Sequence, residues 1–163
     1  MPAHHDIALI KLASPAKLSQ HVQILELDKE QWPMDLSRQC TVAGFGGNIY
    51  DDSKLRISEF KFTHGCACVK DLEIICTHIL EDGADSPCYG DSGAAVVCDN
   101  KGVAVISTFI EEAYCTKVKP ERPSFGCGVK DIFHLATYLQ PHLQWINQVI
   151  QMDRAELYSK ANI

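Results

Sequence analysis

The chain has 163 residues, of which 46% are apolar and 22% are charged, so it is long enough for one domain with a buried core and is not a disordered chain. Its formal net charge of −6, without a basic cluster, makes nucleic acid and anionic membranes poor partners. No apolar run approaches the length that crosses a bilayer.

Eight cysteines in so short a chain favour disulfides and an oxidising compartment, which predicts a secreted, extracellular protein. Residues 1–5 contain neither the apolar core nor the cleavage site of a signal peptide. We therefore expect an N-terminal part of the protein to precede this chain.

The first predicted element is a buried strand over residues 4–12, where β-branched and apolar residues follow one another. A turn over residues 13–15 ends this strand. Asp6 opens the apolar run, and a buried carboxylate costs several kcal/mol unless it is hydrogen-bonded or paired. Asp6 is therefore a candidate functional residue, and a solvent-exposed aspartate at the start of a strand is the alternative.

Further elements follow in chain order. Residues 13–39 are polar and interrupted by proline, as in a connecting segment. Strands are predicted over residues 39–47, which end in glycines, over 55–62, where apolar and polar residues alternate, and over 103–110. Apolar residues recur at helical spacing over 139–150 and predict a C-terminal helix.

The most informative stretch runs from Asp85 to Cys98, where Ser92 lies between Gly90 and Gly93. Glycines let the backbone turn tightly and approach a ligand. Such a turn can aim the N–H groups of Gly90 and Ser92 at one point, which is the arrangement that a developing oxyanion requires. A glycine-rich turn that happens to hold a serine is the alternative interpretation.

The segment Gly90–Gly93, with the sequence Gly-Asp-Ser-Gly, resembles the signature of the trypsin/chymotrypsin family of serine proteases, with Ser92 in the place of the nucleophile. The segment Asp6–Leu9 is similar to the strand of that family whose aspartate orients the catalytic histidine. Ser107 lies where the family has a serine that hydrogen-bonds this aspartate. The chain departs from the pattern after Gly93, where two alanines replace the usual Gly-Pro.

This resemblance implies an all-β fold: the second antiparallel β-barrel of a two-barrel protein, followed by a C-terminal α-helix. The chain would divide into the last strand of the first barrel (1–12), an inter-barrel crossover (13–39), the second barrel (40–137) and the helix (138–152). Most of the first barrel would precede residue 1.

The resemblance also places either Asp85 or Ser86 at the base of the primary specificity pocket, depending on how Pro87 is accommodated. An aspartate there favours Arg or Lys in the substrate, whereas a serine favours apolar or aromatic groups. Phe109 stands where the family commonly has glycine at the pocket wall, and so large a side chain narrows or blocks the pocket. A solvated loop carboxylate is the alternative for Asp85.

The eight cysteines can be paired by the same resemblance, although two choices stay open. The implied pairs are Cys40 with Cys98, Cys76 with Cys68 or Cys66, and Cys88 with Cys115 or Cys127. The two remaining cysteines either pair with each other or have a partner outside this chain. A zinc site formed by Cys66, Cys68, Cys76 and His78 is a competing interpretation, but the irregular spacing and the cysteine content favour disulfides, so we predict no metal and no cofactor.

The family relationship implies a serine endopeptidase that cleaves protein or peptide substrates through an acyl-enzyme and that protease inhibitors can bind. A serine hydroxyl needs an adjacent general base, and in the family that histidine lies far ahead of the aspartate. His4 would lie about 7 Å from Asp6 along a strand, which is an awkward position for a base that must bridge Asp6 and Ser92.

The resemblance also makes Asp91 the partner of an N-terminal ammonium group that zymogen cleavage releases. Without such a partner, we expect Asp91 to turn elsewhere and the oxyanion donors to be misaimed. For both reasons little or no peptidase activity is expected of the chain alone. The alternative function is that of a catalytically silent homologue that acts as a binding or regulatory protein.

Overall fold

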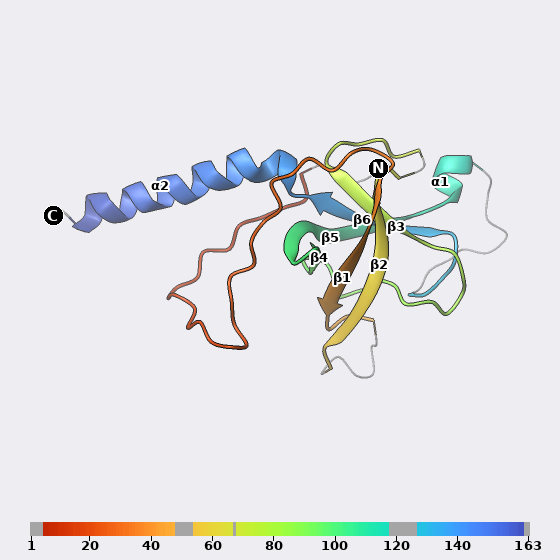
Figure 1. Cartoon of the computed structure of the whole chain (residues 1–163), viewed down its shortest axis with the longest axis horizontal. Helices are drawn as coiled ribbons and strands as arrows, with labels where there is room; N and C mark the ends of the chain where they lie inside the picture. Colours follow the sequence, from red (N-terminus) through yellow and green to blue (C-terminus); the bar gives the residue numbers. More distant parts are fainter. Residues whose placement is uncertain (1–4, 48–53, 67, 118–126, 162–163) are drawn as a thin grey trace.

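The computed structural model of the chain describes residues 5–47, 54–66, 68–117 and 127–161. Within these residues the strands pair antiparallel and close into a barrel in the order β1-β2-β3-β6-β5-β4 (Figure 1). The strands are β1 (Ser37–Gly44), β2 (Arg56–His64), β3 (Ile74–Ile79), β4 (Ala95–Cys98), β5 (Lys101–Glu111) and β6 (Ile132–Tyr138). This architecture confirms the predicted antiparallel β-barrel.

The helices lie outside the barrel. A short helix α1 (Ala113–Thr116) follows β5, and a 3₁₀ turn η1 (Gln140–His142) leads from β6 into the long helix α2 (Leu143–Ala161). The helix α2 points away from the barrel and carries the C-terminus (Figure 1). No helix in the described part of the chain has the length and apolar character needed to cross a membrane.

Three of the strands correspond to those that the sequence predicts, namely β1, β2 and β5, and α2 corresponds to the predicted C-terminal helix. The sequence analysis missed β3 and β6. Nearly all residues of β3 and every residue of β6 are buried. A strand that is buried on both faces shows no alternation of apolar and polar residues, so periodicity does not reveal it.

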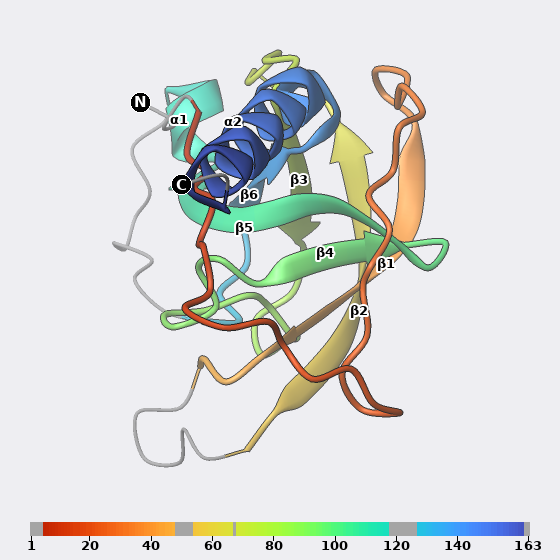
Figure 2. The ribbon, with the colours of Figure 1, turned by 90° about the vertical axis from the view of Figure 1, so that its left-hand side faces the viewer.

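The predicted buried strand over residues 4–12 is wrong for the part that the structure describes. Residues 6–12 form no strand, and the side chain of Ile10 is 87% exposed. This segment runs outside the barrel (Figure 2), and no described strand pairs with it. A β-strand requires a hydrogen-bonded neighbour, so apolar sequence alone does not form one.

The hydrophobic core fills the inside of the barrel. Its main cluster contains residues from each of the strands β1 to β6 and one residue that precedes the barrel, Trp32. The other members are Cys40, Val42, Phe60, Phe62, Ile75, Val96, Cys98, Val103, Ala104, Ile106, Ala136 and Tyr138. The Cys40–Cys98 disulfide lies within this core and ties β1 to β4.

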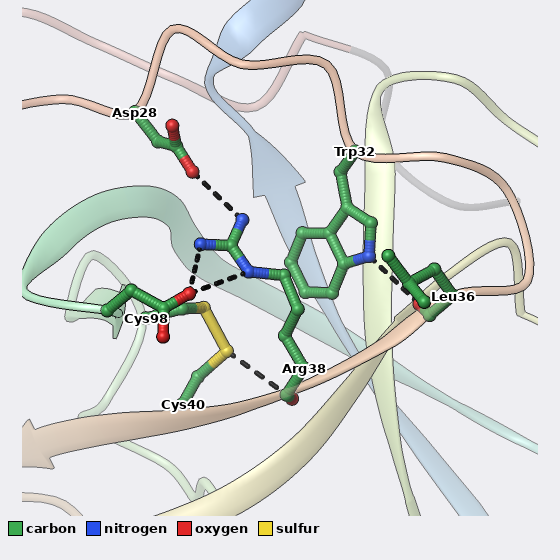
Figure 3. Close-up of a disulfide and its surroundings, with 7 residues drawn as sticks. Asp28, Trp32, Leu36, Arg38, Cys40 and Cys98 are labelled. Carbon is green, nitrogen blue, oxygen red and sulfur yellow. Dashed lines mark hydrogen bonds and ion pairs between the residues drawn. A yellow bond between two sulfur atoms is a disulfide. The ribbon is translucent and has the colours of Figure 1, made fainter.

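A charged and aromatic cluster attaches the segment before β1 to the barrel. The guanidinium of Arg38 lies 4.9 Å from the centre of the Trp32 ring and donates hydrogen bonds to Asp28 and Asp99 at 2.9 and 2.7 Å (Figure 3). The backbone N–H of Trp32 donates to the hydroxyl of Tyr138 on β6 at 2.8 Å. Arg38 therefore joins the segment that holds Asp28 and Trp32 to Asp99, which lies between β4 and β5.

The carboxylate of Asp28 is buried and depends on this cluster. Burial by itself would raise the pKa of Asp28, but the hydrogen bonds from Arg38 and from the Glu30 N–H, together with the charges of Arg38 and Lys101, bring the pKa below its ordinary value of 3.8. Because the pKa is lower in the folded state, the ionised carboxylate stabilises the fold above about pH 5, and this stability is lost as the pH falls through the folded-state pKa.

We expect Asp28→Asn to lower the free energy of unfolding at pH 7 by about 2 kcal/mol, because it removes the charge that Arg38 faces in a buried setting. The difference from the wild type shrinks as the pH falls below 3.8. Urea denaturation at pH 7 and pH 3 measures both effects, with the exposed Glu59→Gln on β2 as the matched control. An equal loss at both pH values would contradict this assignment.

A histidine interrupts the apolar run of β6. His134 is 6% exposed, and its Nε2 has no hydrogen-bond partner in the described part of the chain. Burial disfavours the charged imidazolium and lowers the pKa of His134 from 6.5 to about 4, although the nearby charge of Asp91 opposes the shift. His134 is therefore a neutral imidazole at pH 7.

This depressed pKa predicts a pH-dependent stability. The unfolded chain binds a proton at His134 more readily than the folded chain. The free energy of unfolding is therefore highest above about pH 6.5 and falls by about 3 kcal/mol as the pH drops towards 4. His134→Leu removes this component, whereas the exposed His21→Gln leaves it in place. Denaturation curves measured from pH 4 to 7 test this prediction, and the same slope in His134→Leu as in the wild type would refute it.

Candidate active site

The loop before β4 presents Ser92 at the surface. Gly90 and Gly93 adopt φ values of +95° and +90°, which only glycine adopts readily. The loop is fixed by hydrogen bonds from the Gly93 N–H to the carbonyl of Ile106 and from the Ala94 N–H to the carbonyl of Asp91, at 2.8 and 2.9 Å. The N–H groups of Gly90 and Ser92 donate to no other group among the described residues. They remain available to a ligand oxygen.

The buried side chain of Asp91 holds this loop in place. Its carboxylate is buried and accepts hydrogen bonds from the N–H groups of Gly46 and Cys88 at 2.9 and 2.8 Å. A Cβ atom at position 46 would lie 2.7 Å from Oδ1 of Asp91, so the glycine after β1 permits this close approach. The carboxylate thus turns to two backbone amides, as expected for an Asp91 that has no ammonium partner.

Ser107 connects Ser92 with Asp6. The Ser92 hydroxyl donates to the backbone carbonyl of Ser107 at 3.2 Å, and the Ser107 hydroxyl donates to Oδ2 of Asp6 at 2.5 Å. The hydroxyl of Thr137 on β6 donates to the backbone carbonyl of Asp6 at 2.9 Å. The structure thus brings together three residues that the sequence analysis selected and that lie up to 101 positions apart.

The position of Ser107 depends on an irregularity in the sheet. The register between β5 and β6 shifts between Ile106 and Thr108. At such a β-bulge a residue leaves the ladder, and its polar groups turn to other partners. The backbone carbonyl of Ser107 therefore lies outside the β5–β6 register and accepts the hydrogen bond from Ser92, while the side-chain hydroxyl of Ser107 donates to Asp6.

The general base is the group that these contacts do not supply. None of the described histidines hydrogen-bonds to Ser92 or to the carboxylate of Asp6. His5 adjoins Asp6 in the sequence, but its Nδ1 lies 2.9 Å from Oε2 of Glu73. The other candidate that the sequence suggested, His4, lies outside the described residues.

A hollow of about 180 Å³ opens beside Ser92 and is lined mainly by aromatic and apolar side chains. The Phe109 ring packs against the rings of Tyr89 and His134, with centroids 6.3 and 6.1 Å apart. Phe109 thus lines the hollow that it was expected to narrow. The sequence analysis did not select His134, although a histidine inside the apolar run 132–136 was an available signal.

The structure does not bring Asp85 and Ser86 into this hollow. Oδ2 of Asp85 accepts a hydrogen bond from the Ser58 hydroxyl at 2.9 Å, and the Ser86 hydroxyl accepts one from the Gly128 N–H at 2.7 Å. Both residues line a second hollow of about 310 Å³. Pro87, Cys88 and Cys127 border both hollows and separate them.

All eight cysteines form disulfides. The pairs are Cys40–Cys98, Cys66–Cys76, Cys68–Cys115 and Cys88–Cys127. The first pair agrees with the prediction, and the structure resolves both open choices: Cys66 rather than Cys68 joins Cys76, and Cys127 rather than Cys115 joins Cys88. The competing zinc site is wrong, because its cysteines are not free thiols.

Comparisons with known proteins agree with this geometry. The family model described as Trypsin matches residues 2–134. Trypsin-1 of Gadus morhua is 34% identical over 113 residues, which cover 64% of this chain and 46% of the cod protein. Trypsin of Sus scrofa is 28% identical over 157 residues, which cover 90% of this chain and 60% of the pig protein.

A solved structure of mouse neuropsin, described as a serine protease expressed in the limbic system of the brain, shares the fold. It superposes with a TM-score of 0.65 at 20% sequence identity and covers 85% of this chain and 58% of neuropsin. The chain thus spans about half the length of the curated relatives that it matches. Because the family match covers most of the residues, and the loop that holds Ser92 and the barrel agree with it, the chain belongs to the trypsin family.

Proposed function

We propose that Ser92 is the nucleophile of a serine endopeptidase and that Asp6 orients the histidine that activates it. The observation that carries this proposal is the contact of both residues with Ser107, one through the backbone carbonyl and the other through the hydroxyl. A chance glycine-rich turn would have no reason to share a partner with Asp6.

The chemistry follows from these positions. Ser92 attacks the carbonyl carbon of the scissile bond while a base removes the proton of its hydroxyl. The N–H groups of Gly90 and Ser92 stabilise the oxygen on which negative charge develops. The Ser92 hydroxyl must first exchange its hydrogen bond with the Ser107 carbonyl for one with an imidazole. Because no described histidine occupies that position, the chain alone is expected to hydrolyse peptides very slowly.

The substrate class follows from the hollow beside Ser92. Its aromatic and apolar lining and its volume of about 180 Å³ suit a small, uncharged side chain. The carboxylate of Asp85, which would select Arg or Lys, faces the second hollow and is hydrogen-bonded to Ser58. This geometry favours small apolar groups over basic ones next to the scissile bond.

The second candidate function is that of a catalytically silent homologue that binds other proteins. The observations that favour it are the engagement of the Ser92 hydroxyl by a backbone carbonyl and the position of the Phe109 ring in the hollow. In either case the four disulfides favour a secreted protein. An active peptidase would have protein substrates and protease inhibitors as its partners.

A fluorophosphonate probe separates the two functions, because it labels a serine only when a base activates it. The protein purified from its natural source is expected to be labelled at Ser92, and Ser92→Ala is expected to abolish labelling. Asp6→Asn slows labelling by about 10⁴-fold if Asp6 orients the base. Mass spectrometry of the labelled peptide identifies the site. An unlabelled Ser92 in the natural protein would establish the silent homologue instead.

The size of the hollow can be tested through Phe109. Phe109→Gly opens the hollow, so phosphonate probes with a phenylalanine side chain are expected to react at least about 10-fold faster with this variant, because a large apolar group gains burial. Probes with an alanine side chain are expected to change little. Ile57→Gly, at an exposed strand position that lines neither hollow, serves as the control. Equal acceleration of both probes would show that Phe109 does not set the size limit.

A further inference from the structure

Three side chains converge at a place that the proposed function does not use. Nδ1 of His5 lies 2.9 Å from Oε2 of Glu73, and Nε2 of His142 lies 3.9 Å from the same oxygen. One ligand atom from each of these residues lies within 4.8 Å of the other two. The two imidazole rings stand edge to face with their centroids 5.6 Å apart.

Two of these atoms are buried without a hydrogen-bond partner. His142 is 6% exposed, and both its Nε2 and Oε2 of Glu73 lack a hydrogen bond within the described part of the chain. The contact with Nδ1 of His5 at 2.9 Å serves Oε2 of Glu73 but leaves Nε2 of His142 unsatisfied. Buried polar atoms without partners are rare and costly, so this nitrogen of His142 requires an explanation.

The main chain around these residues is fixed. The N–H of Tyr138 donates to the carbonyl of Glu73 at 2.8 Å, and the N–H of His142 donates to the carbonyl of Leu139 at 2.9 Å. The N–H of Glu73 donates to the side chain of Asp71 at 2.8 Å. Glu73 precedes β3 and His142 ends η1, so two of the three side chains stand on a rigid framework.

We propose that His5, Glu73 and His142 bind a divalent transition-metal ion, for which Zn²⁺ is the best match. Two imidazole nitrogens and one carboxylate oxygen form a ligand set that Zn²⁺ prefers, whereas Ca²⁺ and Mg²⁺ prefer oxygen alone. Bonds of 2.0–2.1 Å at tetrahedral angles place ligand atoms about 3.3 Å apart. The separations of 2.9 and 3.9 Å lie on either side of that value.

The bound ion would also hold the chain next to the candidate active site. His5 directly precedes Asp6, whose carbonyl accepts the hydrogen bond from Thr137. The side chain of His5 is 70% exposed, so the metal ion would be the main link between His5 and the residues Glu73 and His142. The fourth coordination position of the ion would remain open to water. This site does not depend on the proposed peptidase activity.

Isothermal titration of the disulfide-intact chain with Zn²⁺ tests the site directly. The wild type is expected to bind one ion at this site. Glu73→Gln is expected to weaken the affinity for Zn²⁺ by at least about 10-fold, because substitution of a residue that merely hydrogen-bonds to a metal ligand already has an effect of this size. His5→Gln should do the same. Because His5 is exposed, this variant remains decisive even if a substitution of the buried His142 prevents folding.

The matched control is His78→Gln. His78 belongs to a second group of possible ligands with Glu112 and Asp131, which is more exposed, so this variant should retain the wild-type affinity. Visible absorption of bound Co²⁺ provides an independent readout: the intense bands of tetrahedral coordination should appear in the wild type and in His78→Gln and be absent in Glu73→Gln. No binding by the wild type, wild-type affinity in both His5→Gln and Glu73→Gln, or a loss of binding confined to His78→Gln would overturn the proposal.

Discussion

The hydrogen bonds of Ser107 are the contacts on which the candidate active site depends. The backbone carbonyl of Ser107 accepts a hydrogen bond from the Ser92 hydroxyl, and the Ser107 hydroxyl donates a hydrogen bond to the carboxylate of Asp6. This backbone carbonyl is available because the register of β5 against β6 shifts at this point, which leaves Ser107 without a partner residue on β6. This register shift within the closed barrel thus decides where Ser92 and Asp6 come together.

The barrel supplies the rigidity that this arrangement needs. Its core is continuous through the strands, and the Cys40–Cys98 disulfide lies inside it. Arg38 then attaches the preceding segment through Asp28 and the Trp32 ring (Figure 3). A loop that is fixed to such a scaffold holds its side chains in one geometry, which is what preorganised catalytic groups require.

Burial determines the chemical character of the hollow beside Ser92. His134 is a neutral imidazole there because the surroundings penalise its charged form. Phe109 and Tyr89 complete an apolar lining, while the carboxylate of Asp85 is hydrogen-bonded to Ser58 in the other hollow. The carboxylate of Asp85 is therefore separated from Ser92 by the wall that contains Cys88 and Cys127. For the proposed peptidase, this separation is the reason to expect small uncharged groups next to the scissile bond.

The sequence by itself determined the family, the barrel and the identity of Ser92, Asp6 and Ser107 as candidates. These depend on local features: a glycine pair around a serine, alternating strands such as β2, and a helical repeat in α2. The tertiary structure alone decided which cysteine joins which, that residues 6–12 form no strand, and that Asp85 and Phe109 line different hollows. It also brought His5, Glu73 and His142 together. Such contacts join residues that are far apart in the chain, and their geometry depends on how the strands register and pack, which the spacing of residues along the sequence does not encode.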